Sequence, residues 1–163
     1  MKEKKQIVFI MTDTTRADML NCYRDTGLKT PCLDALSEEG IQFNKAYTCQ
    51  PVCGPARSAI FTGTYPHSNG MFTNSLAMGA NVKTVGQRLS DNGIHSAYIG
   101  KYHLDGGDYF GTGECPEGWD PNYWYDMRTY LEELSRDERV KSRIPATNEE
   151  GIDESFTYGN RCT

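Results

Sequence analysis

A cysteine and an arginine stand four residues apart in the stretch "CGPARSAIFTG" (53–63). The small residues, with Pro55 in the first turn and Gly63 near the end, predict a helix that begins close to Cys53. Unpaired N–H groups and the positive end of the dipole at a helix start favour a thiolate or an oxyanion. Arg57 follows one turn later on the same face and is suited to hold an anion. The spacing fits a reactive residue in an anion-binding corner and, equally well, a buried structural cysteine beside a surface arginine.

Three more chemically active residues follow apolar stretches that are typical of strands. Asp13 comes just after "QIVFIM" (6–11), a continuous apolar run of the kind found in strands buried on both faces. Lys101 and His103 close "HSAYIGKYH" (95–103). Ligands in open α/β sheets bind at the carboxyl ends of the strands, so these positions favour a site. Asp13 also fits a turn or a helix N-cap, and Lys101 alone also fits a solvated charge.

The elements that must position these residues alternate between strands and helices. "TPCLDALSEEG" (30–40) predicts a helix with Thr30 as N-cap, and "IQFNKAYT" (41–48) alternates like a strand. "TVGQRLSDNG" (84–93) predicts another helix. The alternation predicts an α/β fold with a mainly parallel sheet flanked by helices.

The sequence changes character from about residue 105. Glycine, aromatic and acidic residues fill 105–127, which predicts a surface loop, and 128–143 follows as a charged helix with Glu132 and Arg136 at i, i+4. The chain stops in ordered-looking sequence. We therefore interpret 1–163 as one partial domain, the incomplete N-terminal part of a larger one.

Composition excludes several classes of partner. Of 163 residues, 37% are hydrophobic and 24% charged, and the net charge of −5 argues against general binding of nucleic acid or anionic membranes. No apolar run approaches the roughly 18–20 residues of a membrane span. The apolar stretch near the start of the chain is too short for a secretion signal. This predicts a cytoplasmic protein, or a periplasmic one if a leader was removed. Six cysteines show no zinc spacing, and free thiols are expected at 22, 32, 49, 53, 115 and 162.

Four separated motifs together resemble the sulfatase family. "CGPAR" followed by "SAIFTG" is similar to its C-x-P-x-R signature with the downstream T-G. "IVFIMTDTTRADML" resembles its first strand and metal-ligand turn, "TGTYPHSNG" the segment after the signature helix, and "GKYH" its G-K-x-H element. The resemblance covers about the first 110 residues and implies the alkaline-phosphatase-like fold.

The resemblance implies a role for each matching residue. In the family the cysteine is converted by a formylglycine-generating maturation enzyme, which implies that Cys53 becomes a formylglycine hydrate that attacks the sulfur of a sulfate ester. Asp13 resembles a ligand of the divalent cation, normally Ca²⁺, which the hydrate at Cys53 also contacts. Arg57 resembles the group that orients the hydrate, and Lys101 and His103 resemble groups that contact sulfate and hydrate.

The chain departs from the family pattern at two places. Thr14 follows Asp13 where many sulfatases carry a second acid, and some phosphate or phosphonate ester hydrolases of this fold also lack that acid. The family's remaining metal ligands would lie beyond residue 163. One aspartate and the modified Cys53 make an incomplete cage for Ca²⁺, so this chain alone is expected to bind metal poorly and to have little activity.

Three hypotheses about function therefore remain open. The chain is part of a sulfatase acting on a sulfated small molecule or sugar, part of a phosphate or phosphonate ester hydrolase, or an inactive fragment that self-associates or pairs with another chain. The "YWYD" stretch near residue 125 fits a substrate rim or a stacked surface patch. Asn74 is a candidate to line the substrate pocket, His67 to contact the site indirectly, and His95 to be an ordinary strand residue.

Overall fold

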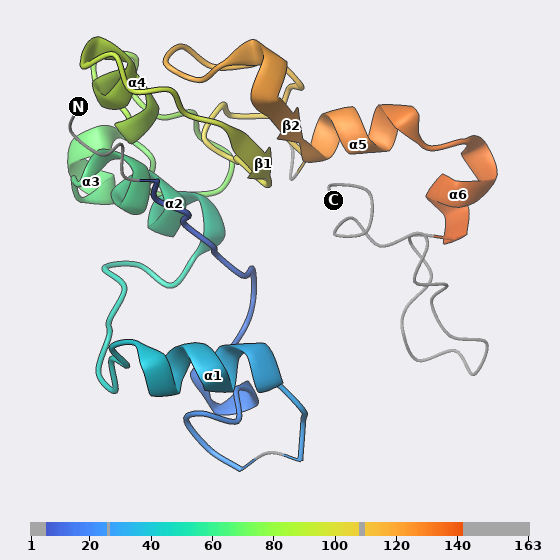
Figure 1. The fold of residues 1–163 in the computed structure, drawn as a ribbon. Helices are drawn as coiled ribbons and strands as arrows, with labels where there is room; N and C mark the ends of the chain where they lie inside the picture. Colours follow the sequence, from blue (N-terminus) through green and yellow to red (C-terminus); the bar gives the residue numbers. More distant parts are fainter. Residues whose placement is uncertain (1–5, 26, 108–109, 142–163) are drawn as a thin grey trace, which may run out of the picture. The chain divides into compact units, whose positions relative to one another are not determined.

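The computed structural model describes residues 6–25, 27–107 and 110–141. The chain divides into two compact units, residues 1–47 and residues 48–163. Figure 1 draws the helices and strands of both units along the chain. Among the described residues, no helix combines the length and the apolar character that a membrane span requires.

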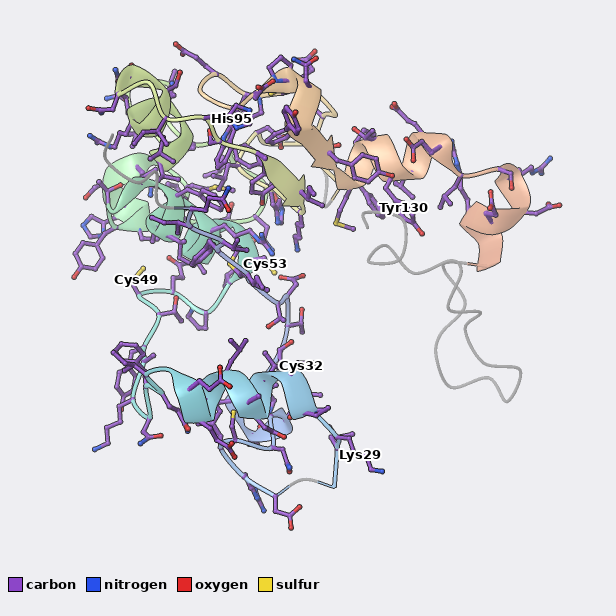
Figure 2. All side chains as sticks on the ribbon, in the orientation of Figure 1. Lys29, Cys32, Cys49, Cys53, His95 and Tyr130 are labelled. Atoms are coloured by element: carbon purple, nitrogen blue, oxygen red, sulfur yellow. The ribbon has the colours of Figure 1, made fainter. Side chains whose placement is uncertain are left out.

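The first unit is built around one α-helix, α1 (Pro31–Glu39), which follows a 3-10 turn, η1 (Ala17–Met19). The prediction of a helix over 30–40 is confirmed, with Pro31 in the first turn and Gly40 after the last. Thr30 does not cap the helix as expected, because its hydroxyl donates to the Asp34 carboxylate at 3.0 Å and accepts from the Asn21 N–H. Figure 2 shows Cys32 on α1 and Lys29 just before it.

Two predicted strands of the first unit are not formed. Residues 6–11 and 41–48 carry no strand in the structure, so both predictions are wrong. The side chains of Ile7 and Val8 are 91% and 82% exposed, which is the opposite of burial on both faces. The apolar pattern indicates which side chains a strand would bury. A strand forms only when a neighbouring strand pairs with its backbone.

The second unit holds the parallel sheet, which confirms the α/β fold class. Strand β1 (Tyr98–Gly100) pairs with β2 (Trp124–Asp126), and Figure 1 shows the two strands side by side. The described part of this unit also contains the helices α2 (Cys53–Thr62), α3 (Pro66–Asn69), α4 (Val85–Asp91), α5 (Met127–Glu133) and α6 (Arg136–Lys141), with a 3-10 turn, η2 (Pro121–Tyr123).

The segments after β1 differ from their predictions in two details. Within the predicted surface loop 105–127, the structure has η2 and then β2. The predicted charged helix 128–143 is interrupted near Leu134, whose backbone is extended, so Glu132 and Arg136 lie in different helices. The last two residues of that prediction lie outside the described ones.

Asp126 is the N-cap of α5. Its buried carboxylate accepts hydrogen bonds from the N–H and the hydroxyl of Thr129, both at 2.8 Å.

Aromatic rings form the core of the second unit. The Trp124 ring stacks on Tyr98 with centroids 5.0 Å apart, and Phe61 of α2 meets Tyr98 edge-on at 5.8 Å. Tyr102 and Trp119 complete the cluster. Burial raises the pKa of Tyr98 and of Tyr102 to about 12, so both phenols are neutral at pH 7. Through Phe61 and Tyr98 the cluster packs α2 against β1, and through Trp124 it includes β2.

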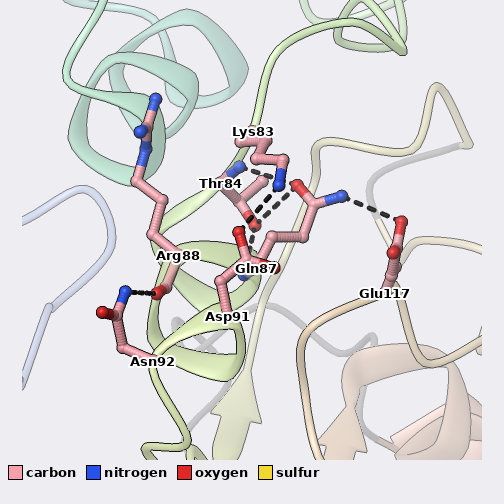
Figure 3. Close-up of polar contacts among 7 residues, drawn as sticks. All are labelled: Lys83, Thr84, Gln87, Arg88, Asp91, Asn92 and Glu117. Atoms are coloured by element: carbon pink, nitrogen blue, oxygen red, sulfur yellow. Dashed lines mark hydrogen bonds and ion pairs between the residues drawn. The ribbon is translucent and has the colours of Figure 1, made fainter.

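Helix α4 is defined by contacts at both of its ends (Figure 3). The Thr84 hydroxyl accepts from the Gln87 N–H, and the Gln87 side chain accepts from the Thr84 N–H at 2.8 Å, which makes a capping box. Lys83 bonds Asp91 near the other end at 2.7 Å. Gly86 lies where a Cβ atom would come within 2.6 Å of the Trp119 ring. The prediction of a helix over 84–93 is therefore confirmed, with bounds shorter at both ends.

Candidate active site

Cys53 is the first residue of α2, as the sequence predicts. Val52 before it has extended backbone, and the Ala56 N–H donates to the Val52 carbonyl at 2.9 Å, which closes the first turn. Gly63 ends the helix in the left-handed region at φ 70°, where glycine is favoured. The Cys53 side chain is half-buried, and Figure 2 shows it at the start of α2. A half-buried thiol at a helix start is both shielded and reachable.

Arg57 joins α2 to the carboxyl end of β1. Its guanidinium Nη1 donates to the Lys101 backbone carbonyl at 2.5 Å, and the Tyr98 hydroxyl donates to the same oxygen at 2.6 Å. Arg57 is only 5% exposed, so the alternative of a surface arginine is excluded. This bond spans 44 positions of sequence and brings the "CGPAR" and "GKYH" motifs of the resemblance into contact.

Lys101 and His103 are both buried at the end of β1. Lys101 is 7% exposed and His103 is 3% exposed, so the reading of Lys101 as a solvated charge is excluded. His103 has a positive φ of 59°, which is uncommon for a residue other than glycine. Backbone in this region costs free energy and tends to occur at functional sites. The positive φ of His103 turns the backbone at this residue, and the chain then continues into Leu104 and Asp105.

The ionisation of His103 is set by its surroundings. Burial is the largest cause that lowers the pKa of His103, followed by the positive charges of Lys101 and Arg57. A hydrogen bond with the Asn74 backbone and the charge of Asp105 act in the opposite direction without reversing it. The imidazole is therefore neutral at pH 7 and can accept a proton or donate an uncharged hydrogen bond.

Asn74 contributes more to this region than the sequence indicates. Its side-chain Oδ1 accepts a hydrogen bond from the Gly54 N–H at 2.8 Å, directly after Cys53. Its backbone bonds the His103 side chain. The sequence marks Asn74 only as a candidate pocket residue, because nothing local reveals a contact across 20 positions.

Asp13 belongs to the first unit and lies in a turn. The Thr15 hydroxyl donates to the Asp13 carbonyl at 3.3 Å, and Thr14 has a positive φ of 58°. The following 3-10 turn begins after Arg16, so Asp13 is not the N-cap that the sequence allows. The Asp13 side chain is half-buried. Its role as a metal ligand stays a prediction.

The other candidates have ordinary surroundings. His67 is exposed and stacks on Tyr65 with centroids 5.5 Å apart. His95 is exposed (Figure 2), bonds the Asp120 carboxylate at 2.6 Å and meets Tyr123 edge-on. The cysteines of the described part are all free thiols, at positions 22, 32, 49, 53 and 115. Cys162 lies outside the described residues.

No cluster of three or more His, Cys, Asp or Glu side chains suited to a metal ion occurs in the part of the chain that the structure describes. Arg57, Lys101 and His103 instead give a group with positive and neutral donors at the end of β1. Such a group can bind and polarise an anion such as a sulfate or phosphate ester.

Comparison with known proteins identifies relatives over almost the whole chain. The family model described as Sulfatase matches residues 5–158. The chain is 47% identical to the uncharacterized sulfatase YidJ of Escherichia coli over 99% of its own length and 33% of that protein. It is 31% identical to an N-acetylglucosamine-6-O-sulfatase of Bacteroides thetaiotaomicron over 80% of the chain and 25% of that protein.

Solved structures give the same relationship. BT4656 in complex with its substrate D-glucosamine-2-N,6-O-disulfate matches 75% of this chain with a TM-score of 0.64 and 31% identity, over 23% of its own chain. The putative sulfatase yidJ of Bacteroides fragilis matches 69% of this chain with a TM-score of 0.58 and 34% identity, over 27% of its own chain. The present chain thus spans a third or less of the length of these relatives.

Proposed function

The chain belongs to the sulfatase family, and from that premise we propose that it forms part of an enzyme that hydrolyses sulfate esters at Cys53. The observation that carries the proposal is the hydrogen bond from Arg57, one turn after Cys53, to the backbone of Lys101. It joins the helix that begins with Cys53 to the strand end that carries Lys101 and His103. Two regions that resemble sulfatase motifs therefore meet around one helix start.

The proposed nucleophile is a formylglycine made from Cys53 by a maturation enzyme. Its hydrate supplies one hydroxyl that attacks the sulfur while the ester oxygen leaves as an alcohol, and a second hydroxyl that lets sulfate depart as the aldehyde re-forms. The half-buried position of Cys53 suits this chemistry, because the residue is reachable yet partly shielded from water. The N–H groups at the start of α2 favour negative charge there.

The neighbouring side chains stabilise charge and move protons. Arg57 places a buried positive charge one turn from Cys53 and helps to neutralise the developing oxyanion. Lys101 adds a second buried positive charge and binds the sulfate group. His103 contacts the hydrate, and as a neutral imidazole at pH 7 it can take up a proton.

Asp13 is proposed as a ligand of a divalent cation because its motif resembles the family's metal-ligand turn. Its carboxylate oxygens are the kind of ligand that Ca²⁺ prefers, and a bound cation would polarise the sulfate. Ca²⁺ takes about 6–8 oxygen ligands, so the single aspartate that the resemblance assigns fills only part of its coordination shell. For that reason we propose that this chain by itself binds the cation weakly and turns over slowly, whereas a polypeptide of the length of its relatives is active.

We propose a sulfated sugar as the substrate class. The support is that BT4656 is solved with D-glucosamine-2-N,6-O-disulfate and that another relative is an N-acetylglucosamine-6-O-sulfatase. The net charge of −5 does not oppose an anionic substrate, because Arg57 and Lys101 reverse the sign locally.

A substrate panel tests the proposal on the full-length protein that contains this chain, produced together with a formylglycine-generating enzyme. We expect turnover of 4-nitrophenyl sulfate and of N-acetylglucosamine-6-sulfate that exceeds turnover of 4-nitrophenyl phosphate. Cys53→Ala should abolish sulfate release because it removes the nucleophile, whereas Cys49→Ala, an exposed cysteine four residues away, should retain it. Dominant phosphate turnover, or full activity of Cys53→Ala, would refute the proposed function.

A further inference from the structure

The segment 69–79 connects the helix of the proposed nucleophile to the residues after β1. At its start, the buried Asn69 amide donates to the Ser58 hydroxyl of α2 at 3.0 Å, and the Gly79 N–H donates back to the Asn69 carbonyl at 2.8 Å. At its other end, the Met78 N–H donates to the Leu104 carbonyl at 3.1 Å. The segment is thus held at both sides, and Asn74 lies between these two attachments.

Asn74 contacts the first turn of α2 through its side chain. The Gly54 N–H is one of the first four N–H groups of the helix, which have no partner within the helix itself. Asn74 Oδ1 accepts from it at 2.8 Å. The approach is close, because a Cβ atom on Gly54 would lie 3.1 Å from this oxygen and 3.5 Å from the Asn74 Cα. Asn74 therefore fixes the peptide that follows Cys53.

The segment of Asn74 also reaches His103. The Met78 N–H donates to the carbonyl of Leu104, the residue after His103, and Ala77 pairs with Asp105. A hydrogen bond with the Asn74 backbone acts to raise the pKa of His103 against the larger effect of burial. His103 itself is 3% exposed and its backbone has a positive φ. The same residue thus touches the proposed nucleophile's helix turn with its side chain and the proposed hydrate-contacting imidazole with its main chain.

From these two contacts we propose that Asn74 is a positioning residue that aligns position 53 with His103. The inference rests on the proposed function, because alignment matters only if these two groups act together. Asn74 acts through Gly54 and His103 and has no assigned contact with the substrate. A misplacement of about 1 Å between reacting groups can cost about 100-fold in rate, so loss of the Gly54 contact should reduce kcat with little change in KM.

The test compares three variants in the full-length, matured enzyme. Asn74→Ala removes the acceptor for the Gly54 N–H but leaves the backbone bond to His103, so we expect kcat to fall about 10–100-fold and KM to change less than about threefold. Asn74→Asp keeps an oxygen at the same place and should restore most of the kcat. Ser75→Ala, an exposed neighbour whose side chain accepts no bond that the structure records, is the matched control and should keep wild-type kinetics.

Two accompanying measurements separate positioning from a merely structural role. Mass spectrometry of the peptide with position 53 should show the same formylglycine content in all variants, and thermal unfolding should show midpoints within a few degrees. Wild-type kcat in Asn74→Ala would overturn this inference alone. Equal losses in Asn74→Ala and Asn74→Asp, in parallel with lowered unfolding midpoints, would also overturn it. A fully matured wild-type enzyme without sulfate-ester turnover would overturn the proposed function and this inference with it.

Discussion

His103 is the residue whose environment bears most directly on the proposed chemistry. Burial first, and then the charges of Lys101 and Arg57, lower its pKa. A neutral imidazole can serve as a proton acceptor, whereas an imidazolium beside two other cations would be costly. The two cations that are proposed to bind the anionic substrate therefore also favour the neutral form of His103.

The lowered pKa of His103 predicts a definite pH dependence. In an NMR titration, the His103 ring should protonate with a midpoint below the ordinary value of 6.5. Since the unfolded chain takes up this proton near its ordinary pKa and the folded chain only at lower pH, stability is lost as pH falls below about 6.5. His103→Gln should reduce this slope in urea unfolding measured between neutral and acidic pH. A midpoint at or above 6.5 would show that burial and the two cations do not control this side chain.

For single residues, the sequence shows which chemically active side chains lie near one another along the chain, but it predicts their tertiary contacts poorly. Cys53 and Arg57 are four residues apart, which is about one helical turn, so their place on one face of α2 was predictable. The bond from Arg57 to the Lys101 carbonyl was not, because it depends on how α2 packs on β1. Asn74 was predicted only as a candidate pocket residue, and its contacts were not, since they join segments that are distant in sequence.

Helices and strands of this chain differ in how far local sequence determines them. The predicted helices near 30–40, 53–63 and 84–93 are all present, because their capping residues and stop signals are local. Residues 6–11 and 41–48 form no strand, since strand formation needs a pairing partner elsewhere. Strand β2 was not predicted in its aromatic-rich segment for the same reason, because only its pairing with β1 defines it as a strand.

Helix α4 gives a prediction in which tertiary packing reverses a helix propensity. In an exposed helix, replacing glycine by alanine stabilises by up to about 1 kcal/mol. At Gly86 the new Cβ would lie 2.6 Å from the Trp119 ring, so we expect Gly86→Ala to lower the free energy of unfolding by about 1–3 kcal/mol. Ser90→Ala, at an exposed position of the same helix, should change it by less than about 0.5 kcal/mol. Urea unfolding measures both, and a stabilised Gly86→Ala would show that the Trp119 contact is not formed.

The whole chain combines an acidic surface with a small cationic region. Its net charge is −5, yet Arg57 and Lys101 are both buried, and the Arg57 guanidinium donates to the Lys101 backbone carbonyl just after β1. A negative net charge therefore argues against general binding of nucleic acid or anionic membranes but says little about one anionic substrate. Composition alone could predict the first property, while the second required the packing of α2 against the sheet.

The length of the chain bears on its activity as a whole. It spans about a third of YidJ, a quarter of the N-acetylglucosamine-6-O-sulfatase and less than a quarter of BT4656. The proposal for the intact enzyme depends on one chemical event that can be examined directly, which is the conversion of Cys53.

Mass spectrometry of the tryptic peptide 46–57, after production with a formylglycine-generating enzyme, tests that event most directly. The peptide also contains the exposed Cys49, which serves as an internal control for thiol chemistry. After treatment with iodoacetamide, we predict one alkylated cysteine, at position 49, and at position 53 an aldehyde that reacts with a hydrazide. A peptide with both cysteines alkylated and no aldehyde would contradict the account.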